Sequence, residues 1–375
     1  MSSLIKRALL LINNIIPIKK GLIVFESGGK KADSSYELYS YLSKNNVEKN
    51  YEFYWITSNV KKEKKGLLVV PNDMLLKVKQ MYKSSRAEII FSTHGFFTSN
   101  NKGKQKRVYL SHGQSFKNTL GLYNNYENYT HILATSKFSK ELRIKAFGSV
   151  PQAKFIISGL PRNDELFRKV STNSCLPAKF ILWLPTFKHY SLENRNDLGL
   201  ERDYDLQLLT EEFLNEVDNK LKKMNMSLII KYHPKQNLNF VPNNSKNSRI
   251  KILSDDDLRK KNLNLYSILQ LSTALITDFS SVYIDYLLVN KPIAFDLTDM
   301  DQYKDGLGFL VENPLEYMPG SKVYNKSDFF DFLNDIYINR DKFEGDRKKL
   351  RNKVHNDLSG DYTKKLINEI FEEKK

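Results

Sequence analysis

The sequence predicts an α/β fold made of two Rossmann-like halves that face a cleft. Two series of short apolar runs alternate with helical stretches, as expected of strands and helices that follow one another along an α/β chain. The stretch 168–177 (RKVSTNSCLP), between the two series, has little periodicity and ends in a proline. With 375 residues, the chain also exceeds the roughly 250–300 residues at which single cores stop growing. We therefore predict domains at 21–170 and 171–375, preceded by a separate segment at 1–20.

The apolar runs give the predicted strands of each half. In the first half they are residues 21–25, 51–57, 66–70, 87–92, 108–111, 131–134 and 154–158, with a helical pattern at 34–43. In the second half they are residues 180–184, 227–232, 250–252, 274–277 and 292–295.

The segment 271–295 reads as strand, polar turn, helix and second strand, with hydroxyl groups gathered at the turn. Asp278 or Ser280 can cap this helix. Its free N–H groups and positive dipole end, together with the hydroxyls of Ser280 and Ser281, suit a phosphate or diphosphate. The alternative, that these polar residues only cap a helix, fits this segment equally well.

Two histidines follow predicted strands, His112 after 107–111 and His233 after 228–232. Open α/β sheets bind ligands at the carboxyl ends of their parallel strands, so a histidine there can reach a substrate. One such histidine is more often structural. A pair in different halves, together with the predicted phosphate-binding turn at Ser280 and Ser281, indicates a catalytic site. His94, after the run 89–93, is a further candidate.

A series of motifs accompanies these histidines. They are 112–117 (HGQSFK) with Gly121, 159–164 (GLPRND), 184–188 (LPTFK), 231–234 (KYHP), 277–281 (TDFSS) with Asp285, 291–292 (KP), Asp299 with Asp301 and Tyr303, and 316–320 (EYMPG). In its order over 107–331 the series resembles the bacterial CDP-glycerol glycerophosphotransferases of teichoic acid and capsule synthesis. The chain departs from that pattern at 306–309 (GLGF), where an Arg-Gly-Phe is common in the family, and at 114–115 (QS), where a Thr-Pro is commoner.

The resemblance implies a two-domain glycosyltransferase-B fold. It also implies transfer of glycerol phosphate from CDP-glycerol to a hydroxyl of a lipid-linked glycan or polyol-phosphate acceptor, with release of CMP. It places His112 near the acceptor as general base, and His233 near the diphosphate, where it would stabilise or protonate the leaving CMP. The side chains expected at the donor phosphates are Thr277, Ser280 and Ser281, with Asp278 orienting their loop and Lys117, Thr186 and Lys188 as weaker anion contacts.

Some roles and the exact donor stay open at this point. Arg162 and Asn163 are either hinge residues or ligands. The donor could be CDP-ribitol, and a glycosyltransferase of the same architecture that uses a nucleotide sugar explains the two halves and the phosphate seat equally well. A third alternative is a noncatalytic basic protein that binds anionic membranes.

The charge balance indicates an acidic partner, because 59 Lys and Arg against 43 Asp and Glu give a formal net charge of +16. The sequence has no nucleic-acid recognition signature, so we expect an anionic membrane surface and no nucleic acid. Solvated lysine-rich faces are the alternative. Residues 2–20 form a basic, amphipathic stretch too short and broken to span a bilayer, which fits either a helix lying on the membrane or a buried helix. We predict a peripheral protein on the cytoplasmic face of the bacterial cell membrane.

The composition gives no sign of a cofactor. A single cysteine, Cys175, excludes an intramolecular disulfide, and the six histidines show no HxH or HxxxH spacing. The acidic run 255–257 fits a polar loop or helix start better than a Mg²⁺ site. We therefore expect no tightly bound metal and no cofactor.

Overall fold

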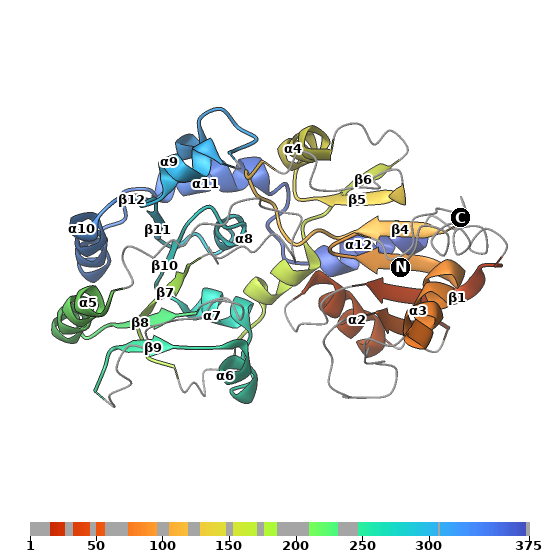
Figure 1. The fold of residues 1–375 in the computed structure, drawn as a ribbon, viewed down its shortest axis with the longest axis horizontal. Coiled ribbons are helices and arrows are strands. Elements are labelled where there is room, and N and C mark those ends of the chain that lie inside the picture. The colour runs from red at the N-terminus through yellow and green to blue at the C-terminus, as the bar shows by residue number, and fades with distance from the viewer. Residues whose placement is uncertain are drawn as a thin grey trace. The chain divides into compact units, whose positions relative to one another are not determined.

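The computed structural model describes residues 16–26, 33–45, 50–56, 74–95, 105–118, 128–147, 153–170, 176–185, 210–231, 247–306 and 308–372. They belong to two compact units, whose elements are labelled in Figure 1. Unit 1 comprises Met1–Gln114, Tyr123–Phe167 and His355–Lys375, and unit 2 comprises Ser115–Leu122 and Arg168–Val354. The α/β class predicted from the alternating runs is confirmed, and the expectation that the two halves face a cleft stays a prediction.

Unit 1 is a six-stranded parallel sheet in the order β2-β1-β3-β4-β5-β6. Its elements are β1 (Lys19–Glu26), α2 (Ser34–Lys44), β2 (Glu52–Ile56), α3 (Met74–Arg86), β3 (Ala87–Ser92), β4 (Lys106–Tyr109), β5 (His131–Ala134), α4 (Lys137–Phe147), β6 (Lys154–Ile157), the 3-10 helix η3 (Pro161–Phe167) and α12 (Tyr362–Glu372). The strand order reverses between β1 and β3, which makes the carboxyl ends of these strands a topological switch point.

Both faces of this sheet are covered, which is why its strands are near-continuous apolar runs. Alternate residues of β1 point to opposite faces: Ile23 and Phe25 pack with α2 and α12, and Leu22 and Val24 lie in a second buried cluster on the α3 side. The C-terminal helix α12 is drawn in blue beside the red and orange elements of unit 1 in Figure 1.

Unit 2 is a second six-stranded parallel sheet, in the order β12-β11-β10-β7-β8-β9. Its elements are β7 (Phe180–Leu184), α5 (Glu211–Met224), β8 (Ser227–Ile230), β9 (Ile250–Ile252), α6 (Asp255–Lys260), α7 (Leu265–Leu271), β10 (Ala274–Thr277), α8 (Val282–Tyr286), β11 (Ile293–Asp296), α9 (Met300–Asp305), η4 (Pro314–Tyr317), β12 (Ser321–Val323), α10 (Lys326–Tyr337) and α11 (Glu344–Val354). Counted along the chain, this is the 3-2-1-4-5-6 order of dinucleotide-binding Rossmann sheets, and its switch point lies between β7 and β10.

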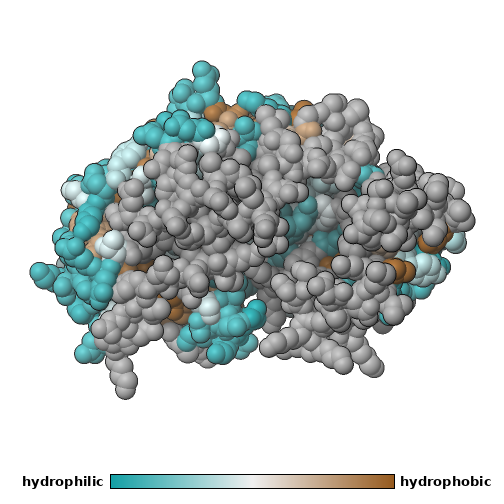
Figure 2. All heavy atoms as spheres, in the orientation of Figure 1, coloured by the Kyte–Doolittle hydropathy of each residue, from teal (hydrophilic) through white to brown (hydrophobic). Residues whose placement is uncertain are grey.

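The core of unit 2 lies between this sheet and helices α5 and α10. Trp183 of β7 is fully buried, and its ring lies 5.2 Å from that of Phe329 of α10 with an angle of 45° between the planes. The Phe329 ring in turn meets Phe213 of α5 edge-on. Helix α5 begins at a Thr210 side-chain cap and ends at Asn225 in the left-handed conformation, as capping chemistry favours. Figure 2 shows that the outward surface over α5 and α10, at the left, is largely hydrophilic.

The division into units differs from the predicted domain limits in two segments, of which the first, Ser115–Leu122, was predicted to belong to the first domain and lies in unit 2. The break between Phe167 and Arg168 is close to the predicted one, but residues 355–375, predicted to belong to the second domain, lie in unit 1. The physical reason is that Leu366 and Ile370 of α12 are buried in the core under the first sheet. Among the described residues, no helix is both long and apolar enough to cross a bilayer. The segment 1–20 lies outside the described residues up to Ile15, and β1 begins at Lys19.

Candidate active site

His112 lies in unit 1 on a tight turn just beyond β4. Ser111, before it, has a φ of 62°, and Gly113, after it, has a φ of 144°, so both flanking residues adopt backbone conformations that L side chains disfavour. The Ser111 hydroxyl holds the turn by donating to Gly113 O at 2.8 Å and accepting from Gly113 N at 3.1 Å. Strained backbone of this kind concentrates at functional sites, and here it presents the exposed His112 ring at the end of the sheet.

The hydrogen bonds of His112 fix which nitrogen of its ring can act as a base. Its Nδ1 lies 2.6 Å from Thr93 O, a carbonyl oxygen that can only accept, so Nδ1 carries the hydrogen. In the neutral ring the lone pair is therefore on Nε2. A histidine oriented in this way by a backbone carbonyl is suited to take a proton from a hydroxyl.

His94, at the end of β3, lies directly against His112, because β3 and β4 are neighbours in the sheet. The two ring centroids are 3.9 Å apart with an angle of 34° between the planes. His94 Nδ1 lies 2.8 Å from the Thr93 hydroxyl, and the His94 ring is exposed. The structure thus brings together two candidate histidines that the sequence placed on separate strands.

Two arginines hold the carbonyl oxygens of the His112 turn. Arg162 of η3 donates to His112 O, and Arg143 of α4 reaches Gly113 O at 3.4 Å. Arg143 is also buried over the Tyr109 ring. The structure therefore places Arg162 beside the candidate base, within unit 1, and its guanidinium braces the backbone there.

Asp33 is a charged residue of this site that the sequence analysis missed. It caps α2, with its carboxylate accepting from Ser35 N at 3.4 Å. Burial raises the pKa of Asp33 above its ordinary value, while the hydrogen bond from Ser35 and the nearby charges of Arg162 and His94 lower it. Its sequence signal is an Asp just before a helical pattern, beyond the first predicted strand, which was available but not used.

The Asn163 side chain is placed in the core of unit 1. It is fully buried, and neither its Oδ1 nor its Nδ2 has a hydrogen-bond partner among the described residues. The carboxylate of the next residue, Asp164, accepts hydrogen bonds from Tyr362 N at 2.8 Å and Thr363 N at 3.0 Å and so caps α12. The motif 159–164 therefore combines a contact with the His112 turn and the anchor of α12.

The predicted phosphate seat lies in unit 2 at the carboxyl end of β10, at the switch point beside β7. Ser280 Oγ accepts from Val282 N at 3.5 Å, as the expected capping requires, but helix α8 begins one residue later, after Ser281, which makes no side-chain cap bond. The reason is that Asp278 accepts from Ser280 N at 3.1 Å, which forms an Asx-type turn and delays the helix. Ser280 and Ser281 are half-buried at the end of the strand.

Thr277 differs from these two serines. It is fully buried, and its hydroxyl donates to Leu184 O at 3.1 Å, which ties the carboxyl end of β10 to that of β7. This bond gives Thr277 a structural role in shaping the switch point, where the sequence predicted a phosphate contact.

Lys117 lies in unit 2, although only four residues separate it from His112. Its segment pairs with the loop after α9. Lys117 forms an isolated antiparallel β-bridge with Phe309, and Asn118 N donates to Gly308 O at 2.9 Å. Its Nζ lies 5.7 Å from the centre of the Tyr303 ring, which packs against Phe279.

Three predicted site residues, His233, Thr186 and Lys188, lie outside the described residues. Their predicted roles therefore stay predictions. Over the described ranges there is no group of three or more His, Cys, Asp and Glu side chains that could hold a metal ion.

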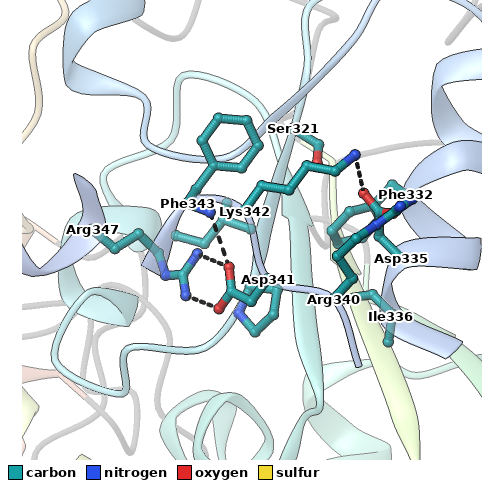
Figure 3. A pocket seen from close by; sticks show the side chains of 11 residues that line it. Ser321, Phe332, Asp335, Ile336, Arg340, Asp341, Lys342, Phe343 and Arg347 are labelled. Atoms are coloured by element: carbon teal, nitrogen blue, oxygen red, sulfur yellow. Dashed lines mark hydrogen bonds and ion pairs between the residues drawn. The ribbon is translucent and has the colours of Figure 1, made fainter. Parts of the chain in front are cut away.

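A small pocket of unit 2 lies at the opposite, amino-terminal ends of β11 and β12, where Ile293 and Ser321 line it. Figure 3 shows its charged side chains engaged with one another. The two terminal guanidinium nitrogens of the fully buried Arg347 donate to the two carboxylate oxygens of Asp341. Lys342 Nζ lies 2.8 Å from the Asp335 carboxylate. These ion pairs tie the loop between α10 and α11 to both helices. The pocket has a volume of about 10 Å³, enough for about one water molecule, so it is not a substrate site.

Comparison with known proteins decides the family. The sequence model of the family described as CDP-glycerol:poly(glycerophosphate) glycerophosphotransferase matches residues 8–372. The chain belongs to this family. The predicted family and enzyme class are thereby confirmed.

Individual relatives agree with this assignment. The chain is 26% identical to the teichoic acid glycerol-phosphate primase of Bacillus subtilis (strain 168), over 84% of this chain and 82% of the primase. It is 26% identical to the teichoic acid glycerol-phosphate transferase of Staphylococcus aureus (strain NCTC 8325 / PS 47), over 84% of each protein.

Solved structures show the same fold. The wall teichoic acid polymerase TagF matches 98% of this chain with a TM-score of 0.73 at 19% identity, over 92% of the TagF chain. MnaA of S. aureus, solved with UDP, matches 93% of this chain and 95% of its own, with a TM-score of 0.55 at 12% identity.

Proposed function

We propose that this glycerophosphotransferase moves glycerol phosphate from CDP-glycerol to a hydroxyl of a membrane-linked glycan or polyol-phosphate acceptor in teichoic acid or capsular polymer synthesis. The acceptor oxygen attacks the β-phosphorus of the donor, a new P–O bond forms, and the bond between the β-phosphorus and the oxygen of CMP breaks. The acceptor proton must go to a base, and the charge on the leaving CMP must be stabilised.

The observation that carries the proposal is the orientation of His112. Its Nδ1–H donates to Thr93 O at 2.6 Å, so the neutral ring carries its basic lone pair on Nε2, the nitrogen proposed to take the acceptor's proton. Arg162 and the Ser111 hydroxyl keep the turn in place, so little reorganisation is needed before proton transfer.

We assign the donor phosphates to unit 2. Ser280 and Ser281 offer hydroxyls at the switch point, and the bond between Asp278 and Ser280 N orients their loop. His233, Thr186 and Lys188 are proposed to join them on sequence grounds, with His233 acting on the leaving CMP. Phosphate held by hydroxyls and cationic side chains does not require a metal, so we propose no resident metal or cofactor.

The test is CMP release by the purified protein from CDP-glycerol, CDP-ribitol and a UDP-sugar, each with a lipid-linked disaccharide in detergent. Acceptor-dependent release from CDP-glycerol alone supports the proposal. Release from CDP-ribitol alone would change the donor, which matters because a ribitol-phosphate polymerase of S. aureus, TarL, is 23% identical over 88% of this chain. Turnover of the UDP-sugar alone would replace the proposal with a glycosyltransferase.

We further propose that the protein works at the anionic, cytoplasmic face of the membrane, where its net charge of +16 attracts it. Removing residues 1–16 leaves β1 intact, since that strand begins at Lys19. We expect this truncation to reduce co-sedimentation with anionic vesicles while CMP release with a soluble acceptor analogue persists. Unchanged sedimentation would contradict a membrane role for this segment, and loss of folding would indicate that it is buried.

A further inference from the structure

The contact between His94 and His112 has a consequence for proton transfer, which rests on the proposed role of His112 as base. Two imidazole rings whose centroids are 3.9 Å apart cannot both be protonated without a repulsive cost, so the two titrations are coupled. Which ring holds the first proton decides whether His112 is neutral and able to act.

The charged groups around the pair differ in sign. They include His94 from the end of β3, whose ring contacts His112, and Arg143 from α4 and Arg162 from η3, which reach the turn, while Asp33 at the start of α2 interacts electrostatically with Arg162 and His94. Both arginines are directed to the backbone carbonyls of the His112 turn, and their positive charge disfavours a second cation there.

Asp33 brings a negative charge to these groups, and the cationic side chains that act on it are Arg162 and, to a smaller extent, His94. The interaction is reciprocal, so a negative Asp33 favours the protonated form of His94. His94 is therefore the ring with a nearby counter-charge, while His112 is the ring whose backbone turn is held by two guanidinium groups.

We infer that His94 and Asp33 are positioning residues for the base: Asp33 favours the cationic form of His94, and cationic His94, in contact with His112, keeps the His112 ring neutral and able to accept the acceptor's proton. Neither residue needs to touch the substrate. The arrangement uses one histidine to set the protonation state of the other, within a single unit of the fold.

The test measures the titration of individual histidines by NMR in protein labelled at its six histidines, which needs neither donor nor acceptor. In His94→Gln, the titration midpoint of His112 should rise by about one pH unit, the shift expected for removal of a unit charge about 4 Å away in a water-like medium. In the matched variant His94→Lys, which keeps a positive charge, the midpoint should stay close to that of the wild type. In Asp33→Asn, the midpoint of His94 should fall.

The corresponding readout in activity is the pH profile of kcat/KM. In His94→Gln the acid limb should move up by about one pH unit, so the loss of rate on the acid side reaches about tenfold, with a smaller loss above the midpoint. General damage to the fold would instead lower the rate similarly at every pH.

Two results would overturn the inference. One is an unmoved His112 midpoint in His94→Gln, or an equal rise in the Gln and Lys variants, which would assign the effect to ring packing and not to charge. The other is an unchanged His94 midpoint in Asp33→Asn. If no donor gives CMP release, the proposed function fails, but the NMR midpoints still decide whether His94 and Asp33 control His112.

Discussion

The two serines at the carboxyl end of β10 give a prediction that separates donor binding from fold stability. Ser280 and Ser281 are half-buried, beyond a turn that Asp278 holds through Ser280 N at 3.1 Å. A hydrogen bond to a charged group contributes about 1.5–3 kcal/mol when buried, and partial exposure reduces this to about 1 kcal/mol for each hydroxyl. Replacing both serines by alanine should therefore weaken CDP-glycerol binding by about 2 kcal/mol, or about 30-fold in Kd.

Isothermal titration calorimetry with CDP-glycerol measures this change, and Thr277→Val is the matched control. Thr277 is fully buried, and its hydroxyl donates to Leu184 O at 3.1 Å, so its loss should lower the free energy of unfolding by about 1 kcal/mol while the Kd stays near the wild-type value. If the double alanine variant binds CDP-glycerol with the wild-type Kd, the assignment of Ser280 and Ser281 to the donor phosphates is refuted. Weakened binding in Thr277→Val alone would show that the control residue contacts the donor.

Two further predictions concern stability. Gly159→Ala should lower the free energy of unfolding by about 2–5 kcal/mol in a denaturant titration, because Gly159 has a φ of +84° and a Cβ there would clash with the Tyr362 ring. The control is Gly345→Ala in α11, which should be neutral or slightly stabilising because nothing lies within 4 Å of the added Cβ. Equal stability of both variants would contradict this packing. The hydrogen bonds from the Ser254 hydroxyl and backbone N–H lower the pKa of Asp257 below 3.8, so its contribution is present above that pH and lost as the pH falls through the folded-state pKa. Acid unfolding of Asp257→Asn should accordingly be less steep below about pH 4 than that of the wild type, and parallel curves would show that this capping box does not contribute.

Much of the fold could be predicted because the strands are buried on both faces and read as apolar runs. Strands β3, β5, β7, β9 and β10 coincide with their predicted ranges, and the loss of periodicity after Phe167 marks the change of unit. Strand β12 was missed because its sequence, SKV, contains one apolar residue and no alternation, whereas the equally short β9 alternates as IKI. The membership of α12 in unit 1 was also unpredictable, since an amphipathic pattern does not say which core will bury Leu366 and Ile370.

The candidate site could be predicted as separate strand ends but not as an arrangement. The position of His112 beyond a strand was evident, but its contact with His94 depends on β3 and β4 being neighbours, which is a property of strand order. The predicted role of Thr277 did not account for its hydroxyl facing β7 within the sheet. Asp33 stands at a helix cap, a pattern usually explained by capping alone, and only its location near His94 and Arg162 gives it a further meaning.

The central claim, that His112 is the base of a CDP-glycerol transferase, is tested most directly by CMP release from CDP-glycerol by His112→Asn with a lipid-linked disaccharide acceptor. The amide of Asn can replace the Nδ1–H bond to Thr93 O but offers no basic nitrogen at the position of Nε2. We expect turnover to fall by about 100-fold or more while calorimetry shows wild-type affinity for the donor. Turnover within a few-fold of the wild type would contradict the account.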